Sequence, residues 1–259
     1  MTAASNIRPV NNTQLVVDAQ FVKTNFLFGV DLHDDNGNEM PDSLIEFYIL
    51  SAQQWLENEL DILLLPTVIT DEAHDYHFTD YTNFNFVRLF RKPVQDVSKV
   101  AMQFPLQTSV IDFNPEWFRI ESTAAQVNLI PTTGTLSSIF IGAGGSFLPM
   151  LYSSREYVPH ILYVSYTAGF GLGKIPMDML ELIGKKASIG PLNIAGDLIA
   201  GAGIATKSIS IDGLSQSIGT TSSATNAGFG ARILTYGKEI DVALKALRGI
   251  YRGLNMTVA

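Results

Sequence analysis

The stretch that decides the fold is PHILYVSYTAGFGLGKIPMDMLELIGKKASIGPLNIAGDL, residues 159–198. Ile161–Tyr166 alternates in the manner of a strand, with successive residues on opposite faces. Three glycines follow, beginning with Gly169, and glycine allows the backbone angles that a turn into a helix often needs. Pro176 suits a first helical turn because the amide that it lacks would have no intrahelical partner there. The stretch therefore predicts a strand, a glycine-rich turn and a helix.

The helix after Pro176 shows apolar residues at helical spacing: Met177, Leu180, Ile183 and Ala187. Gly190 and Pro191 predict a kink or a split, since proline inside a helix removes one hydrogen bond and clashes with the preceding turn. A second helical stretch is then expected from Leu192 to about Ile199.

The N-terminal part predicts one long helix. Short apolar stretches between residues 11 and 30 favour a strand or two, and DDNGNEMPDS, residues 34–43, combines turn formers with the start of a helix. Behind it, six apolar residues step by three or four positions, which predicts an amphipathic helix ending before Pro66. These residues are Ile45, Ile49, Ala52, Leu56, Leu60 and Leu63.

From about His74 to Tyr166 the pattern changes to short runs of aromatic and β-branched residues between turn formers, which predicts strands. The candidate strands are Asn83–Phe90, Val97–Phe104, Trp117–Glu121, Gln126–Ile130, Ser138–Ile141 and Ile161–Tyr166.

Residues 200–230 are rich in Gly, Ser, Thr and Ala, a composition typical of a flexible linker. Their isoleucines are too apolar for a solvated spacer, so we favour a segment that orders against a neighbouring subunit. Within it, KSISIDGLSQSI can form a hairpin turning at Asp212-Gly213, a pair that favours tight turns. A C-terminal helix follows, with apolar residues Ile233, Tyr236, Ile240, Leu244, Leu247 and Tyr251 at helical spacing.

Composition bounds the function. The chain has 259 residues, 46% of them hydrophobic, a net charge of −8 and no cysteine. A sequence-specific DNA-binding protein is usually basic, and disulfides and thiolate metal sites are excluded. The N-terminus lacks the apolar core of a signal peptide. The uncharged stretch Ser122–Ser154 is interrupted by glycines and Pro149, so we expect a β-rich excursion and not a membrane helix.

No sequence motif for catalysis or for binding a phosphate or a metal ion is complete in this chain. AGFGLGK, residues 168–174, lacks the glycine and the Ser or Thr of a phosphate-binding loop, with Ala168 and Ile175 in those places. DLHDDNG, residues 31–37, lacks carboxylates at the ends of a calcium loop. His74 and His77 lie among acidic residues, and we interpret that region as a solvated acidic turn. We therefore expect no enzyme, no catalytic or metal-binding residue and no cofactor.

The stretch of strand, AGF turn, Ile-Pro and helix resembles head-tail connector (adaptor) proteins of tailed bacteriophages. WLENELDILLLPT at the end of the first helix resembles the family's opening helix and its exit, and IPMDMLELIGKKASI resembles a later helix. The segment IAGDLIAGAGIATKSISIDGLSQSIGTTSSATNAGFGARI resembles connector proteins of some large phages. The resemblance covers roughly residues 24–70 and 159–253.

The resemblance implies an α+β fold in which an N-terminal helical pair and C-terminal helices form a helical bundle around an inserted β-rich region. The expected ranges are 1–70 for the N-terminal arm and first core helices, 71–158 for the β-rich subdomain, and 159–259 for the strand, AGF turn and C-terminal helices with a flexible segment at 200–230.

The implied function is structural. Connector proteins form a ring, typically of twelve copies, beneath the portal in the neck of the virion, after assembly in the host cytoplasm. The ring extends the DNA channel, lets double-stranded DNA pass without sequence-specific binding, and docks the tail or a neck completion protein. Another phage structural module, of the tail or baseplate, is the alternative, and an enzyme whose active site follows no motif is a further one. Deleting residues 230–259 is then expected to abolish portal docking.

A closed ring needs two different patches on each subunit. The segment 200–230 and the C-terminal helix are the candidates for contacts with neighbouring subunits or the portal. The candidate residues are Ile204, Ile209, Ile211, Leu214, Ile218, Phe229, Ile233, Tyr236, Ile240, Leu244, Arg248, Tyr251 and Arg252.

Overall fold

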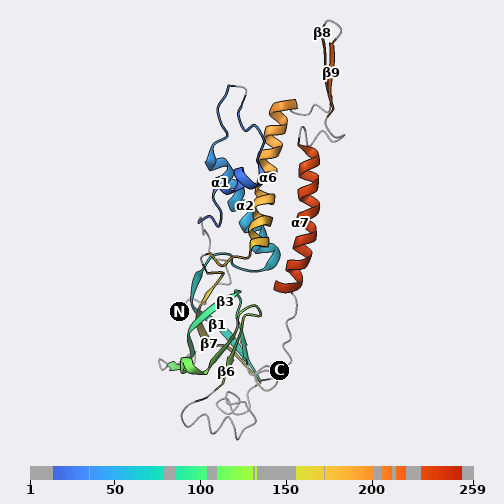
Figure 1. Ribbon diagram of the computed structural model, residues 1–259. Coiled ribbons are helices and arrows are strands. Elements are labelled where there is room, and N and C mark those ends of the chain that lie inside the picture. The colour runs from blue at the N-terminus through green and yellow to red at the C-terminus, as the bar shows by residue number, and fades with distance from the viewer. Residues whose placement is uncertain are drawn as a thin grey trace. The chain divides into compact units, whose positions relative to one another are not determined.

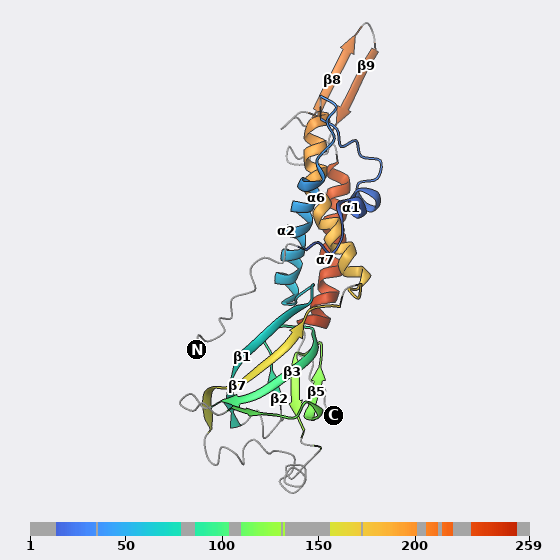
Figure 2. The same cartoon turned by 90° about the vertical axis from the view of Figure 1, so that its left-hand side faces the viewer.

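The computed structural model describes residues 14–34, 36–78, 86–103, 110–130, 132, 156–171, 173–211, 214–219 and 229–252. Figures 1 and 2 show the elements from two sides. They are α1 (Ala19–Phe26), α2 (Asp42–Leu60), β1 (Thr67–His77), β2 (Phe86–Arg88), β3 (Val94–Gln103), β4 (Val110–Asp112), the 3₁₀ helix η1 (Pro115–Trp117), β5 (Phe118–Glu121), β6 (Gln126–Leu129), β7 (Tyr157–Ala168), α6 (Met177–Ala200), β8 (Thr206–Ile211), β9 (Leu214–Gly219) and α7 (Gly230–Tyr251).

The described chain divides into two compact units. We call Thr13–Leu60 with Ile175–Arg252 the helical unit, and Asp61–Lys174 the β unit. The prediction of an α+β fold is confirmed. The three domain ranges expected from the sequence stay a prediction.

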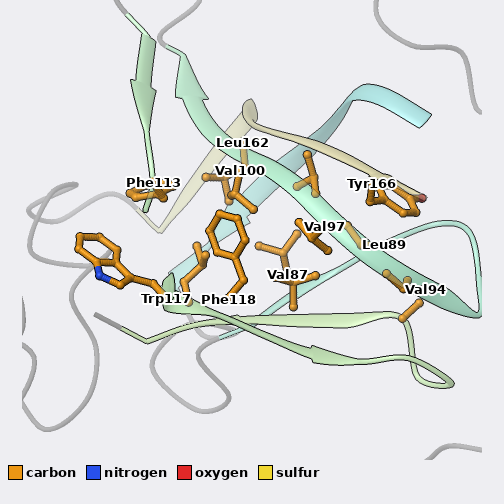
Figure 3. Close-up of a cluster of buried hydrophobic side chains, with 14 of the residues drawn as sticks. Val87, Leu89, Val94, Val97, Val100, Phe113, Trp117, Phe118, Leu162 and Tyr166 are labelled. Atoms are coloured by element: carbon orange, nitrogen blue, oxygen red, sulfur yellow. The ribbon is translucent and has the colours of Figure 1, made fainter. Parts of the chain in front are cut away.

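Two antiparallel sheets form the β unit. One has four strands in the order β1-β7-β3-β4, and the other has three in the order β2-β6-β5. Their inward residues make one apolar core, in which Val100 and Leu162 of the first sheet face Val87 and Phe118 of the second (Figure 3). Burying such side chains contributes about 1.5–3 kcal/mol each, so this core accounts for much of the unit's stability.

The AGF turn is fixed by backbone groups from two other segments of the β unit. The Gly169 amide donates to the Pro93 carbonyl, and the Phe170 amide donates to the Leu64 carbonyl. Gly169 has a φ of 108°, and a Cβ built on it would lie less than 3.0 Å from the Leu65 carbonyl oxygen. Glycine is therefore required here both for its backbone angle and for the close approach of another strand of chain.

In the helical unit, α6 is the central element and packs against α1, α2 and α7. Figure 1 shows it between α2 and α7. Its buried residues include Met179, Ile183, Ala187, Leu192 and Ala195. Because other helices cover α6 on several sides, its apolar residues extend over much of the helix circumference.

Two sequence expectations for the helical unit are wrong. The N-terminal apolar stretch forms α1 in place of a strand, because the Asp18 side chain accepts a hydrogen bond from the Phe21 amide and caps the helix. Of the kink or split expected at Gly190-Pro191, the split is absent, since α6 is one helix through both residues. The ring of Tyr48 lies where a Cβ of Gly190 would stand, so packing against α2 holds the helix together there.

Several other expectations are confirmed. The first long helix and the C-terminal helix are present as α2 and α7, and the strands expected within residues 83–130 correspond to β2, β3, β5 and β6. The hairpin is present as β8 and β9, with Ile211 opposite Leu214. The expected strand Ser138–Ile141 lies outside the described residues.

Gly184 on α6 allows the ring of Phe26 to approach the helix backbone. A Cβ on Gly184 would lie less than 3.0 Å from three ring atoms of Phe26. The same ring packs edge-on against Tyr236, whose hydroxyl donates to the Phe26 carbonyl. Gly184 therefore determines how closely α1, α6 and α7 meet.

Gly184→Ala is expected to destabilise the helical unit by about 1–2 kcal/mol, because the overpacking cost exceeds the gain in helix propensity. Gly237→Ala on α7 is the matched control, since nothing lies within 4 Å of its Cβ position. That control should gain up to about 1 kcal/mol. Urea unfolding followed by the fluorescence of Trp55 in a Trp117→Phe background measures both, and a stabilised Gly184→Ala would contradict the packing argument.

Candidate functional site

The candidate residues in the glycine- and serine-rich segment form part of a hairpin. Ile209, Ile211, Leu214 and Ile218 belong to β8 and β9, which pair with each other alone among the described strands. Ile204 lies outside the described residues. In the register, Ile209 stands opposite Gln216, whereas Ser208 stands opposite Ser217.

The candidate residues on α7 divide by burial. Ile233, Ile240 and Leu244 are buried in the core of the helical unit. Phe229, Tyr236 and Tyr251 are half-buried, while Arg248 and Arg252 are exposed. Arg248 forms an ion pair with Glu59 of α2. The three buried residues thus pack within their own chain. That any of the thirteen candidate residues contacts another subunit stays a prediction.

A different face of α7 is free of such packing. Leu234, Lys238, Val242, Lys245 and Gly249 are all exposed and step by 4, 4, 3 and 4 residues. At 100° per residue this spacing keeps them on one side of the helix. We call them the α7 stripe. Val242 is 71% exposed and Leu234 is 55% exposed, so the stripe presents apolar side chains to solvent.

α2 carries a stripe of the same spacing on its outer side. Ser43, Phe47, Ser51, Gln54 and Asn58 are exposed, and we call them the α2 stripe. They include no charged residue, and Phe47 is 62% exposed. A solvated helix face in an acidic protein normally carries charges. An uncharged face with an exposed aromatic residue is more typical of a surface that another protein covers.

The charges of the two helices are opposite. α2 contains four carboxylates and no Lys or Arg, with half-buried Glu46 and Glu57 beside its stripe. α7 contains four Lys and Arg residues and two carboxylates. Lys238 and Lys245 form no ion pair with any residue that the structure describes. With the exposed Asp241 beside these two lysines, the outer side of α7 is slightly basic in a chain of net charge −8.

These stripes were missed by the sequence analysis because apolar periodicity identifies the residues that face a helix's own core. The signal available in the sequence was Phe47 and Val242, two apolar residues that fall outside the periodic buried positions of their helices.

Half-buried Lys185 joins α6 to α7 through two exposed carboxylates. Its ammonium lies 2.6 Å from carboxylate oxygens of both Glu181 and Glu239. Burial alone would lower the pKa of Lys185, but the hydrogen bonds to the two carboxylates raise it above its ordinary value of 10.5. The stabilisation is thus complete below pH 10.5 and is lost as the pH rises through the raised pKa.

The β unit contains a buried polar cluster centred on Glu72. Its carboxylate lies 2.8 Å from the His74 ring Nε2, accepts a hydrogen bond of 2.8 Å from the Tyr166 hydroxyl, and accepts one from the Phe90 amide. The Arg91 amide in turn donates to the Tyr166 hydroxyl oxygen. The cluster joins β1 and β7 to the segment before β3.

The polar cluster corrects one sequence interpretation. Glu72 and His74 are buried, so the solvated acidic turn expected around His74 is wrong for these two residues. The inward positions of β1 are 72, 74 and 76, whereas His77 is exposed. Burial and the charge of Glu72 raise the pKa of Tyr166, which keeps its hydroxyl protonated as a donor.

A second polar group, in a more exposed position, joins the strands β1 and β7. Asp75 accepts hydrogen bonds from the His160 amide and the Tyr157 hydroxyl. Burial opposes ionisation of Asp75, but these hydrogen bonds outweigh it and lower the pKa. His160 has a φ of 49°, so Asp75 holds an irregularity in β7. Within the described part of the chain, no group of His, Asp and Glu residues could hold a metal ion.

None of the helices that the structure describes is both long and apolar enough to cross a membrane.

Two solved structures are similar to this chain. One is a chain of the neck of an empty gene transfer agent particle, computed with C6 symmetry; it is 13% identical, with a TM-score of 0.42, over 70% of this chain and 80% of that one. The other belongs to the virion of a native gene transfer agent particle and is 11% identical, with a TM-score of 0.44, over 94% and 93% of the two chains. No protein-family model and no curated protein matches the sequence.

Because both TM-scores are below 0.5, neither similarity establishes what this chain does.

Proposed function

We propose that the chain is a structural subunit of the neck of a tailed phage or phage-like particle, and that it forms a head-tail connector ring beneath the portal. The observation that carries the proposal is the order of elements. Two helices precede the β unit, and the chain returns through β7 and the AGF turn to α6 and α7. This is the order that the resembled connector family implies.

The surfaces of the helical unit support an assembled state. The α2 and α7 stripes lie on different helices that are both packed on α6. A ring needs two such non-identical surfaces on every subunit. The hairpin adds support, because an isolated two-stranded sheet is only marginally stable in water. We propose that the segment 200–230 orders against a neighbouring subunit.

In this proposal twelve copies surround the DNA channel, residues 229–253 lie near the portal, and the β unit faces the tail side, where a completion protein or the tail docks. The net charge of −8 supports a wall along which DNA passes without sequence-specific binding. The role is mechanical and needs no cofactor.

The test is the mass of the purified protein, measured by light scattering alone and with a portal ring from the same particle. A free ring of twelve 28.3 kDa chains would have a mass of about 340 kDa. We expect that ring, or a complex with portal stoichiometry. If the protein stays monomeric with the portal ring present but joins a tail assembly, we would conclude that it is a tail or baseplate module and not a connector.

Deleting residues 230–259 is a poor test of portal docking, although the sequence suggests it. The deletion removes four buried residues of the helical-unit core: Ile233, Ile240, Leu244 and Leu247. Loss of docking would then follow from unfolding alone. Ile250→Ser with Arg252→Glu changes exposed residues at the same end of α7 and leaves the core intact. Val68→Ser, an exposed position of the β unit, is the control.

A further inference from the structure

The outer faces of α2 and α7 complement each other in three respects. Their exposed stripes have the same spacing, and each includes an exposed apolar residue. The α7 stripe carries two lysines, whereas the charged residues of α2 are all carboxylates and lie beside its uncharged stripe. Within one chain the two stripes cannot cover each other, because both helices pack on α6 and the stripes point away from the core.

The charges indicate which partner binds each face, namely a second copy of the chain. A chain of net charge −8 repels copies of itself over most of its surface. The α7 stripe, with Lys238 and Lys245, is a place where an acidic surface is attracted. The α2 face is acidic at its edge, through Glu46 and Glu57, and uncharged at its centre. Uncharged centres with charged edges are typical of protein interfaces.

A pairing of this kind already exists inside the chain. Arg248 of α7 forms an ion pair with Glu59 of α2 near the C-terminal ends of both helices. These two residues occupy the sides of the helices that face each other within the subunit. On the outward sides, the lysines of the α7 stripe and the carboxylates Glu46 and Glu57 beside the α2 stripe offer the same kind of pairing.

We propose that the α7 stripe of one subunit packs against the α2 stripe of the next, so that Phe47 and Val242 both lie in the interface. Gly249 and the serines of the α2 stripe leave room for close approach of the two helices. The contact joins two different surfaces and therefore propagates around a ring in one direction. This inference rests on the proposed function, since it requires that copies of the chain assemble.

Reversing the charges of one stripe at a time tests the contact. In a first variant, Lys238→Glu and Lys245→Glu make both faces acidic, and in a second, Glu46→Lys and Glu57→Lys make both faces basic. Each variant should repel itself, and the concentration needed for half-assembly should rise at least about tenfold. All four positions are outside the buried core, so melting followed by circular dichroism should be close to that of the unaltered chain.

Mixing the two variants is the decisive step. Every contact in an alternating ring then joins an acidic face to a basic one, so assembly should return to near the unaltered level, with equal amounts of both variants. The chain that carries all four changes should also assemble, because its faces are complementary again. Asp197→Lys, an exposed charge reversal on α6, is the control and should assemble normally.

The outcomes separate this inference from the proposed function. Normal assembly of either charge-reversal variant alone, or failure of the mixture when both variants fold, would overturn the contact between α2 and α7. Neither result affects the connector proposal if the unaltered chain forms rings. Failure of the unaltered chain to assemble, with or without a portal ring, would overturn both.

Discussion

Replacing Gly169 with alanine is expected to lower the free energy of unfolding of the β unit by about 3–5 kcal/mol. The φ of 108° costs an L-residue about 1–2 kcal/mol, and the added Cβ meets the Leu65 carbonyl oxygen, which belongs to backbone and cannot rotate away. The Gly169 amide and carbonyl are also engaged, with the Pro93 carbonyl and the Gln95 side chain. A shift that relieves the clash therefore disturbs those hydrogen bonds.

Gly173→Ala separates the two causes. Gly173 has a φ of 72°, but nothing lies within 4 Å of its Cβ position. Its replacement should cost only the backbone term, about 1–2 kcal/mol. Urea unfolding followed by the fluorescence of Trp117, which is buried in the β unit, measures both variants in a Trp55→Phe background. Equal losses for the two glycines would contradict a role for the close approach of Leu65.

Glu72→Ala is the second large effect, an expected loss of at least about 3 kcal/mol in the same unit. Three donors, the His74 ring, the Tyr166 hydroxyl and the Phe90 amide, lose their acceptor in a buried place. An unsatisfied buried donor costs about 1–3 kcal/mol. The methylene groups of Glu72 also leave a void.

Two further variants check that hydrogen bonding is the cause. Glu72→Gln keeps one oxygen acceptor and should lose less, whereas the exposed Thr70→Ala should change stability by under about 0.5 kcal/mol. Tyr166→Phe in combination with Glu72→Ala should cost less than the sum of the two single changes, since the donor and its acceptor are removed together. Additive losses would show that the hydroxyl and the carboxylate act independently.

The sequence predicts the long elements well because each has a simple period. α2 and α7 bury one face each, and the strands within 86–129 alternate or are bounded by turn residues. The hairpin is predictable from the Asp212-Gly213 pair alone, and its register agrees. The AGF turn is predictable as a turn, but its partners, Leu64 and Pro93, are distant in sequence and leave no mark on it.

The elements that the sequence misses are those decided by contacts across the chain. The polar residues Glu72 and His74 make the sequence of β1 look like an acidic turn. Both are buried, and Glu72 is hydrogen-bonded to His74 and to residues 90 and 166. α6 continues through Pro191 because the surrounding packing outweighs the lost hydrogen bond. The stripes on α2 and α7 can be recognised only after the buried faces are known.

The interruption of the helical unit by the β unit has a consequence for the order of folding during synthesis. α1 and α2 leave the ribosome before the β unit is made, but their apolar faces pack on α6, which comes more than a hundred residues later. At synthesis rates of 5–20 residues per second, the two helices wait on the order of 10 s for their partner. The β unit is continuous in sequence and can complete its core in that interval. The nascent chain thus carries a finished domain while the exposed faces of α1 and α2 remain open to chaperones and to other nascent chains on the same polysome.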